Sequence, residues 1–131
     1  MSEIHKDLTL LGKAVQGTIS ADQLESFPAP NVNLVKFETH EVTSFCPVTA
    51  QPDLYTVVIE YCPAEKCVES KSLKLYLNSF RNDGIFGESL ADKICSDLHK
   101  ALDPRGIRVT TIQQIRGGLQ MTAVSVRGVL V

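Results

Sequence analysis

The sequence lacks the features that mark a membrane protein or a broadly nucleic-acid-binding protein. Its longest apolar runs, such as residues 55–59, fall far short of the ~18 residues that a membrane-spanning helix needs. Its 13 Lys and Arg residues are nearly balanced by 15 Asp and Glu residues, for a net charge of −2. Nonspecific binding to nucleic acid or acidic lipid needs a broad cationic surface. We therefore expect no membrane association, and any nucleic-acid partner would need a local basic patch.

The sequence also lacks the marks of export and of a structural metal. Residues 1–6 have no apolar segment of the kind found in secretion signals, so we expect a cytoplasmic protein with reduced thiols. Among the four cysteines, Cys62 and Cys67 are closely spaced, in a C-x4-C pattern. Because no second pair of ligands lies nearby in the sequence, we expect no metal site there.

What is present is the composition of one folded domain. The chain has 131 residues, of which 44% are hydrophobic and 21% charged, which suffices for a single core. The first thirty residues combine leucines and glycines with a stop at Phe27–Pro30. This pattern predicts an N-terminal arm over residues 1–30, with at most one short helical turn, packed on a neighbouring surface. A single domain is expected over residues 31–131.

Four strands are predicted from β-prone residues and their alternation. The first covers residues 32–42, and its apolar alternation changes phase between Leu34 and Val35, which predicts a β-bulge there. The other predicted strands are residues 54–61, 107–115 and 119–129. The first two are expected to pair as a hairpin with a long connection.

Two helices are predicted between the strand pairs, from apolar residues at helical spacing. The first apolar stripe is Leu73, Tyr76, Leu77 and Phe80, and the second is Leu90, Ile94, Leu98, Ala101 and Leu102. The order ββααββ predicts an α+β fold, an antiparallel four-stranded sheet with both helices on one face. Such a sheet has open edges, which neighbouring subunits commonly cover, so we expect a symmetric oligomer.

A thiol and a carboxyl lie near the connection between the first two strands. Cys46 stands beside Pro47, and Asp53 follows at the start of the next strand. A thiol on a loop is a candidate nucleophile, and a neighbouring carboxyl could move protons to or from the group that it attacks. From spacing alone, an ordinary loop cysteine and a turn-forming aspartate are the favoured interpretation.

The first predicted helix carries basic residues on its polar side. Lys71, Lys74 and Arg81 would suit a phosphate-bearing ligand, although charge pattern alone favours a solvated helix face. Ser70 precedes them and is expected to cap the first helical turn. At the start of the second helix, Glu88 would interact favourably with the helix dipole whatever its function.

Taken together, these residues resemble a known family. Residues 69–82, with Ser44–Pro47 and Gln51–Asp53 before them, closely resemble the NADPH-dependent nitrile reductases of queuosine biosynthesis, in their short, single-domain form. The resemblance runs from about residue 42 to residue 118. It implies the tunnelling fold, which builds rings of subunits with active sites between neighbours. It further implies a homo-oligomer of ten subunits in two facing rings, with a small-molecule substrate and no direct tRNA binding.

The resemblance also implies a role for each matching residue. The nucleophile would be Cys46 and the proton donor Asp53. The substrate, 7-cyano-7-deazaguanine, would be bound by Val68, Glu69, Ser70 and Glu88, and NADPH by Lys71, Lys74 and Arg116. Thiolate addition to the nitrile gives a thioimide, which two NADPH molecules in sequence would reduce to the amine. The two glutamates suit the N–H edge of a guanine-like ring.

One residue departs from the family pattern. Gly87 stands where the family usually has a histidine that supports substrate binding and protonation, so the rate of full nitrile reduction is in question. The role of that histidine would pass to Asp53, to water or to a residue such as His40. Because position 87 opens a helix, a histidine introduced there is expected to cost little stability.

Two other functions compete with the reductase. A transferase relative forms the same thioimide and then accepts an amine, which makes an amidine on a modified nucleic acid. Such relatives tend to lack the helix motif at residues 69–82. A ring-forming binding protein, with a pocket for a deazapurine or pterin but no turnover, is the third interpretation.

Overall fold

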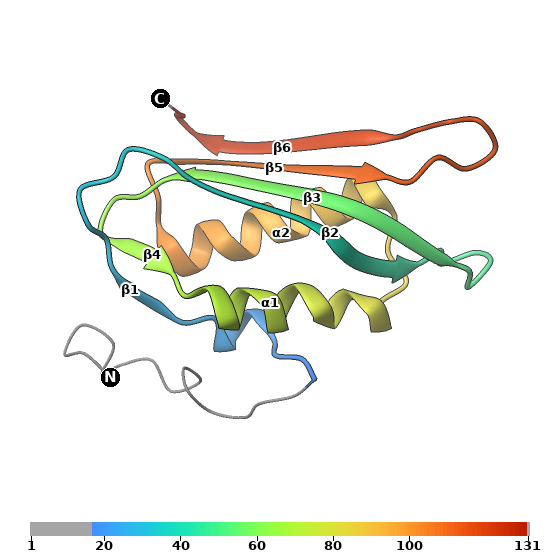
Figure 1. The fold of residues 1–131 in the computed structure, drawn as a ribbon, viewed down its shortest axis with the longest axis horizontal. Coiled ribbons are helices and arrows are strands. Elements are labelled where there is room, and N and C mark those ends of the chain that lie inside the picture. Colours follow the sequence, from blue (N-terminus) through green and yellow to red (C-terminus); the bar gives the residue numbers. More distant parts are fainter. Residues whose placement is uncertain (1–16, 131) are drawn as a thin grey trace.

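The computed structural model describes residues 17–130 and is built on a four-stranded antiparallel sheet with two helices on one face (Figure 1). The four strands are arranged in the order β2-β3-β5-β6. Their bounds are β2 Val35–Phe45, β3 Pro52–Cys62, β5 Gly106–Gln113 and β6 Thr122–Gly128. The helices are α1 Ser70–Asn78 and α2 Gly87–Leu102. The predicted α+β class and the ββααββ order of the main elements are confirmed.

The core lies between the sheet and the helices, as the apolar periodicities require. On α2, Leu90, Ile94 and Leu98 are fully buried, in line with their helical spacing. On β3, alternate residues such as Val57 and Ile59 face the helices and are also buried. The helix stripe and the inner face of the sheet therefore form a single apolar layer.

The hairpin between β2 and β3 extends further than the sequence predicts. β2 begins at Val35 instead of residue 32 and ends at Phe45, and Ser44 pairs with Asp53 in the ladder. The bulge lies between Thr39 and Val42, so its predicted position at residues 34 and 35 is wrong. The phase change read from the sequence marks the point where the strand begins, since Leu34 is exposed and lies outside it.

The start of α1 also differs from the prediction. The residue that caps this helix is Glu69, whose carboxylate accepts hydrogen bonds from the backbone N–H groups of Lys71 (2.7 Å) and Ser72 (2.9 Å). Ser70 is the first residue of the helix, so the predicted capping role of Ser70 is wrong. At its other end, α1 continues into the 3-10 turn η3, Ser79–Asn82, which buries Phe80.

A second, two-stranded sheet was not predicted. Strand β1, Ser26–Pro28, pairs antiparallel with β4, Lys66–Val68. The 3-10 turn η2, Ala21–Gln23, precedes it, and Ile19 is buried in the core. Residues 17–30 of the predicted arm therefore pack on their own domain, whereas residues 1–16 lie outside the described part. The division of the chain at residue 30 stays a prediction.

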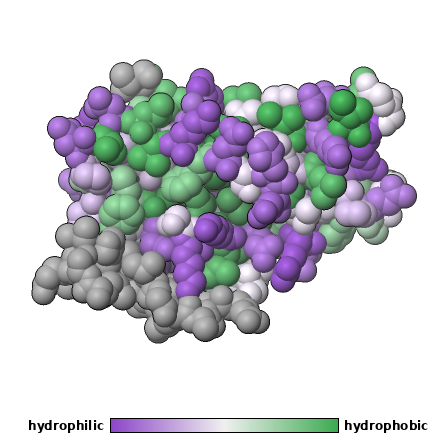
Figure 2. Space-filling view, in the orientation of Figure 1, coloured by the Kyte–Doolittle hydropathy of each residue, from purple (hydrophilic) through white to green (hydrophobic). Residues whose placement is uncertain are grey.

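The surface carries open strand edges and scattered apolar residues. Figure 2 shows hydrophobic and hydrophilic residues interspersed over the visible face. β2 and β6 each lack a neighbour on one side within the described sheet, and Val124 and Val126 of β6 are more than half exposed. No helix in residues 17–130 is long and apolar enough to cross a membrane. The same residues contain no group of three or more side chains placed to hold a metal ion, and the four cysteines, which all lie among them, form no disulfide.

Candidate active site

Cys46 lies in the tight connection that follows β2. Its backbone N–H donates to the carbonyl of Gln51 (2.9 Å), and its carbonyl accepts from the N–H of Ala50 (2.8 Å). Ala50 adopts a left-handed conformation with φ of 59°, which closes the turn. The connection is therefore held by backbone hydrogen bonds, and it presents the thiol at one end of the sheet.

The surroundings of the Cys46 thiol favour its ionised form. The pKa of the thiol is lowered from its ordinary value, chiefly by a hydrogen bond from the side chain of Thr49 and then by the backbone of Thr49 and Val48. Slight desolvation and the charge of Asp53 act weakly in the opposite direction. Because the thiolate is the nucleophilic form, this environment suits attack on an electrophilic carbon.

Asp53 lies beside this loop and is held by an arginine. Its side chain is only 4% exposed and forms an ion pair with the guanidinium of Arg116. The same guanidinium donates to the side-chain carbonyl of Gln51 at 3.3 Å. Arg116 therefore holds together the carboxyl and the loop that carries the thiol.

Arg116 lies in a tight turn between β5 and β6. Arg116 and Leu119 exchange backbone hydrogen bonds of 2.9 and 3.0 Å. Gly117 and Gly118, between them, have positive φ angles of 57° and 79°, which favour glycine. This tight turn sets the guanidinium against Asp53.

The start of α2 meets the same end of the sheet. The N–H of Phe45 donates to the carbonyl of Asp83 (3.0 Å), and the N–H of Ile85 donates to the carbonyl of Phe45 (3.1 Å). The hydroxyl of Thr111 on β5 donates to the carbonyl of Gly87 at 2.8 Å. These bonds hold the exposed carboxylate of Glu88 near the loop of Cys46. Four predicted site residues, Cys46, Asp53, Glu88 and Arg116, are thus gathered at one end of the molecule.

The other predicted substrate residues, at positions 68–70, lie at the start of α1, away from the Cys46 end. Val68 is buried, and its N–H donates to the Tyr61 hydroxyl at 3.0 Å. Glu69 is 4% exposed and caps the helix. The nine residues of α1 span about 13 Å at the normal helical rise, and Figure 1 shows its first turn beside β4, far from the β2–β3 turn. Within one chain, residues 68–70 do not meet Cys46.

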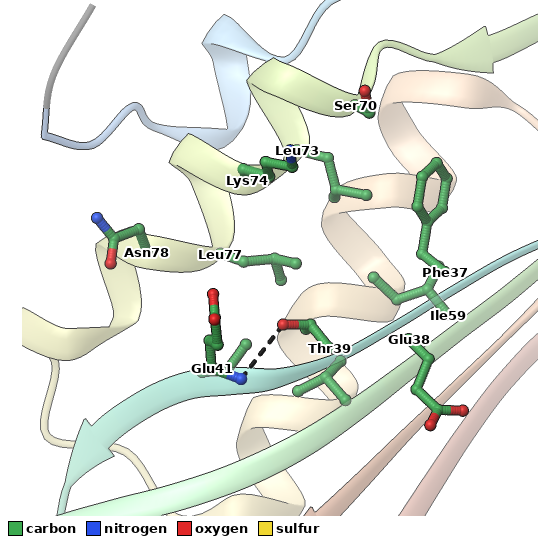
Figure 3. A pocket seen from close by; sticks show the side chains of 12 residues that line it. Phe37, Glu38, Thr39, Glu41, Ile59, Ser70, Leu73, Lys74, Leu77 and Asn78 are labelled. Carbon is green, nitrogen blue, oxygen red and sulfur yellow. Dashed lines mark hydrogen bonds between the residues drawn. The ribbon is translucent and has the colours of Figure 1, made fainter.

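A cavity of about 240 Å³ lies between α1 and β2 (Figure 3). Leu73, Lys74 and Leu77 face it from the helix, and Thr39 and Glu41 face it from the strand. The cavity brings together Ser70 and Lys74 of the helix motif, but its lining includes neither the thiol nor the carboxyl of the Cys46 end. Lys74 is exposed and Lys71 is half-buried.

Two further residues, Tyr55 and Gly87, lie at the Cys46 end, and the sequence indicated only Gly87. Tyr55 on β3 follows Asp53 by two residues and so faces the helices on the same side of the sheet, a relation that strand alternation could have revealed. Gly87 is buried against it, because a Cβ at position 87 would lie 2.9 Å from the ring atom Cε1 of Tyr55 and would also overlap Cε of Met121. The expectation that a histidine fits at position 87 at little cost is therefore wrong. The space is taken by two side chains, one of which is a buried ring.

The chain resembles proteins of one family over most of its length. Residues 52–128 match the family described as QueF-like protein. A protein of Bacillus subtilis (strain 168) is 50% identical over 122 residues, which cover 87% of this chain and 73% of that protein. A protein of Anaeromyxobacter sp. (strain Fw109-5) is 45% identical over 113 residues, which cover 84% of this chain and 92% of that protein. Both are named NADPH-dependent 7-cyano-7-deazaguanine reductase.

A solved structure shares the fold. The archaeosine synthase QueF-Like in its apo form superposes with a TM-score of 0.72 at 25% sequence identity. The match covers 77% of this chain and 99% of the synthase chain. The architecture described above is therefore that of a solved relative.

Proposed function

Because this chain belongs to the QueF-like protein family, we propose that it is an NADPH-dependent 7-cyano-7-deazaguanine reductase. It reduces the nitrile of this small molecule to the aminomethyl group, a step of queuosine biosynthesis. The observation that carries the proposal is the Cys46 thiol of lowered pKa beside the Asp53–Arg116 pair. The identities of 45–50% to reductases, against 25% to the archaeosine synthase, favour reduction over amidine formation.

The first step is addition of Cys46 to the nitrile carbon. The sulfur forms a bond to carbon, one C–N π bond breaks, and the nitrogen takes up a proton to give a neutral thioimide. The proton that leaves the thiol when the thiolate forms goes to solvent, and Asp53 can relay a solvent proton to this nitrogen, so the step needs no net proton. Arg116 orients the carboxyl for the transfer through its ion pair.

Reduction of the thioimide to the free amine requires two hydrides, two protons and cleavage of the C–S bond, which returns Cys46 to the thiol; two NADPH molecules would supply the hydrides when they are bound. The residues that would hold the cofactor are Lys71, Lys74 and Arg116. The ammonium groups of the two lysines stand three residues apart on α1, one helical turn, which suits the phosphate that distinguishes NADPH from NADH. Arg116 is 42% exposed and paired with Asp53, so a cofactor contact by this residue would use its outer guanidinium face.

The substrate site is shared between two subunits in this proposal. Residues 68–70 lie too far from Cys46 of their own chain to reach one small molecule bound there, so a neighbouring chain supplies them. The open edges of β2 and β6 leave room for such neighbours. An assembly of ten chains in two facing rings agrees with this arrangement. The substrate is a free heterocycle, so the enzyme needs no direct contact with tRNA.

A cytoplasmic location is part of the same proposal. The mechanism requires Cys46 as a thiol, and Cys46 forms no disulfide in the structure. The cytoplasm is the compartment that keeps thiols reduced.

Covalent capture of the substrate tests this function. Intact mass spectrometry of the protein mixed with 7-cyano-7-deazaguanine and no NADPH is expected to show one adduct of the substrate mass per chain. Cys46→Ala should abolish the adduct, whereas Cys95→Ala, which removes a buried thiol beneath β6, should retain it. An adduct that survives Cys46→Ala would place the nucleophile elsewhere.

A further inference from the structure

One buried polar group at the Cys46 end is left without a partner. The hydroxyl of Tyr55 is shielded from solvent and forms no hydrogen bond with any residue that the structure describes. The hydroxyl of Ser44 lies close by and donates to the carbonyl of Ile85 at 3.3 Å, but it does not meet the phenol at hydrogen-bond distance and geometry. Leaving a buried donor unpaired is costly, and native structures contain few such groups. The other two tyrosines both use their hydroxyls, Tyr61 with Val68 and Tyr76 with Asp97.

The position of this hydroxyl links it to the substrate site. Tyr55 shares its face of β3 with Asp53, and its pKa responds to the charges of Asp53, Glu88 and Arg116, which places it among the groups of this end. Burial is the main cause of a pKa raised above the ordinary value; the nearby Ser44 hydroxyl acts in the opposite direction, and the two carboxylates add to the rise. The phenol therefore keeps its proton and acts as a donor.

Gly87 and Met121 border the buried hydroxyl of Tyr55. A Cβ at position 87 would lie 3.2 Å from the Tyr55 hydroxyl oxygen, so the phenol occupies the space of the side chain that this glycine lacks. The Met121 methyl group lies against the same point. Met121 is only half-buried and its side chain is flexible, so it can move aside when a ligand enters.

We propose that Tyr55 is a further substrate-binding residue, whose hydroxyl donates a hydrogen bond to the nitrile-bearing heterocycle held at Cys46. The inference rests on the proposed function and adds a residue to its site. In this chain the polar group that contacts the substrate is the Tyr55 hydroxyl on β3, which takes the place of a polar side chain at position 87 at the start of α2. Gly87 is then the counterpart of Tyr55, because the aromatic ring needs the room that the glycine leaves.

Two matched variants test the role of the hydroxyl. Tyr55→Phe should lower both the rate of adduct formation and kcat/KM by roughly three- to tenfold, the loss of one hydrogen bond. Its Tm should stay the same or rise, since the deleted hydroxyl has no protein partner. Tyr76→Phe should do the reverse, because it loses the 2.6 Å bond to Asp97 outside the site: its Tm should fall while its kinetics stay those of the wild type.

The outcomes separate this inference from the function on which it rests. If the wild type forms an adduct and Tyr55→Phe reacts at the same rate, the inference fails and the function stands. A Tm for Tyr55→Phe as low as that of Tyr76→Phe would also overturn it, since the hydroxyl would then have a protein partner. Absence of an adduct in the wild type would overturn the proposed function itself.

A double variant tests whether Tyr55 and Gly87 share one space. Gly87→His alone should lower Tm, because the new side chain meets the Tyr55 ring. In Tyr55→Ala the ring is gone, so adding Gly87→His should raise kcat/KM above that of Tyr55→Ala and leave Tm nearly unchanged. If the losses in activity and Tm instead add, the two positions do not substitute for each other and the inference is wrong.

Discussion

At the scale of single residues, the proposed chemistry depends on the hydrogen bonds around one thiol. Cys46 was identifiable from the sequence only through the motif around it, since a loop cysteine beside a proline is otherwise ordinary. The structure adds a hydrogen bond from Thr49 that lowers the pKa of the thiol, which suits the proposed role of Cys46 as the nucleophile. Tyr55 could not be singled out from the sequence, because an aromatic residue on a strand normally belongs to the core. Its unpaired hydroxyl is visible only when the fold is known.

Removal of the Thr49 hydroxyl should shift the pH dependence of adduct formation. The thiolate is the reactive form, so the rate rises with pH through the pKa of Cys46, and the lowered pKa places this rise below the range of an ordinary thiol. Thr49→Val removes the first cause of the lowering and should move the rise to higher pH, with a slower reaction at pH 7. At high pH both proteins should reach the same plateau. Superimposable pH profiles would show that Thr49 does not tune the thiol.

At the scale of elements, periodicity located the long strands and helices but not the short strands or the cap. The stripes of α2 and β3 follow from burial on one side, which the sequence records directly. β1 and β4 are three residues each and too short to show an alternation. The sequence predicts the cap of α1 at Ser70, one position after Glu69, which forms it. The structure shows that the N–H of Glu69 bonds to the carbonyl of Glu25 (2.8 Å), which ends the extended chain and starts the helix there.

The cap of α1 gives a stability prediction. Glu69→Ala should lower the free energy of unfolding by about 1 kcal/mol, because the N–H groups of Lys71 and Ser72 lose their acceptor. Ser70→Ala, at the exposed first position of the same helix, should cost little. Denaturant unfolding of both variants measures the difference. Equal losses in the free energy of unfolding for Glu69→Ala and Ser70→Ala would mean that the Glu69 carboxylate contributes nothing as a cap.

At the scale of the whole molecule, the sequence motif misleads about distance. Residues 68–70 and Cys46 read as one site, yet in a single chain they lie at opposite ends of α1. This separation cannot be predicted from a sequence pattern, because it depends on the direction in which α1 runs along the sheet. The predicted oligomer resolves the conflict if one chain supplies the thiol and its neighbour supplies the capped end of α1.

Mixed assemblies should reveal such a shared site. Cys46→Ala and Glu69→Gln are each expected to lose most turnover, the second because a substrate-binding carboxylate becomes an amide. After the two are unfolded and refolded together in equal amounts, roughly a quarter of the sites should combine the native residue at both positions, and activity should return to about that level. Continued inactivity of the mixed assembly, with wild type recovering in the same procedure, would place the whole site within one chain.

The central claim is that this chain reduces a nitrile with NADPH, and the stoichiometry of that reduction tests it most directly. Purified wild-type protein is mixed with a known amount of 7-cyano-7-deazaguanine and excess NADPH, and the fall in NADPH absorbance is compared with the amine formed. We predict two NADPH consumed for each nitrile and one aminomethyl product. An adduct at Cys46 with no consumption of NADPH would contradict the account.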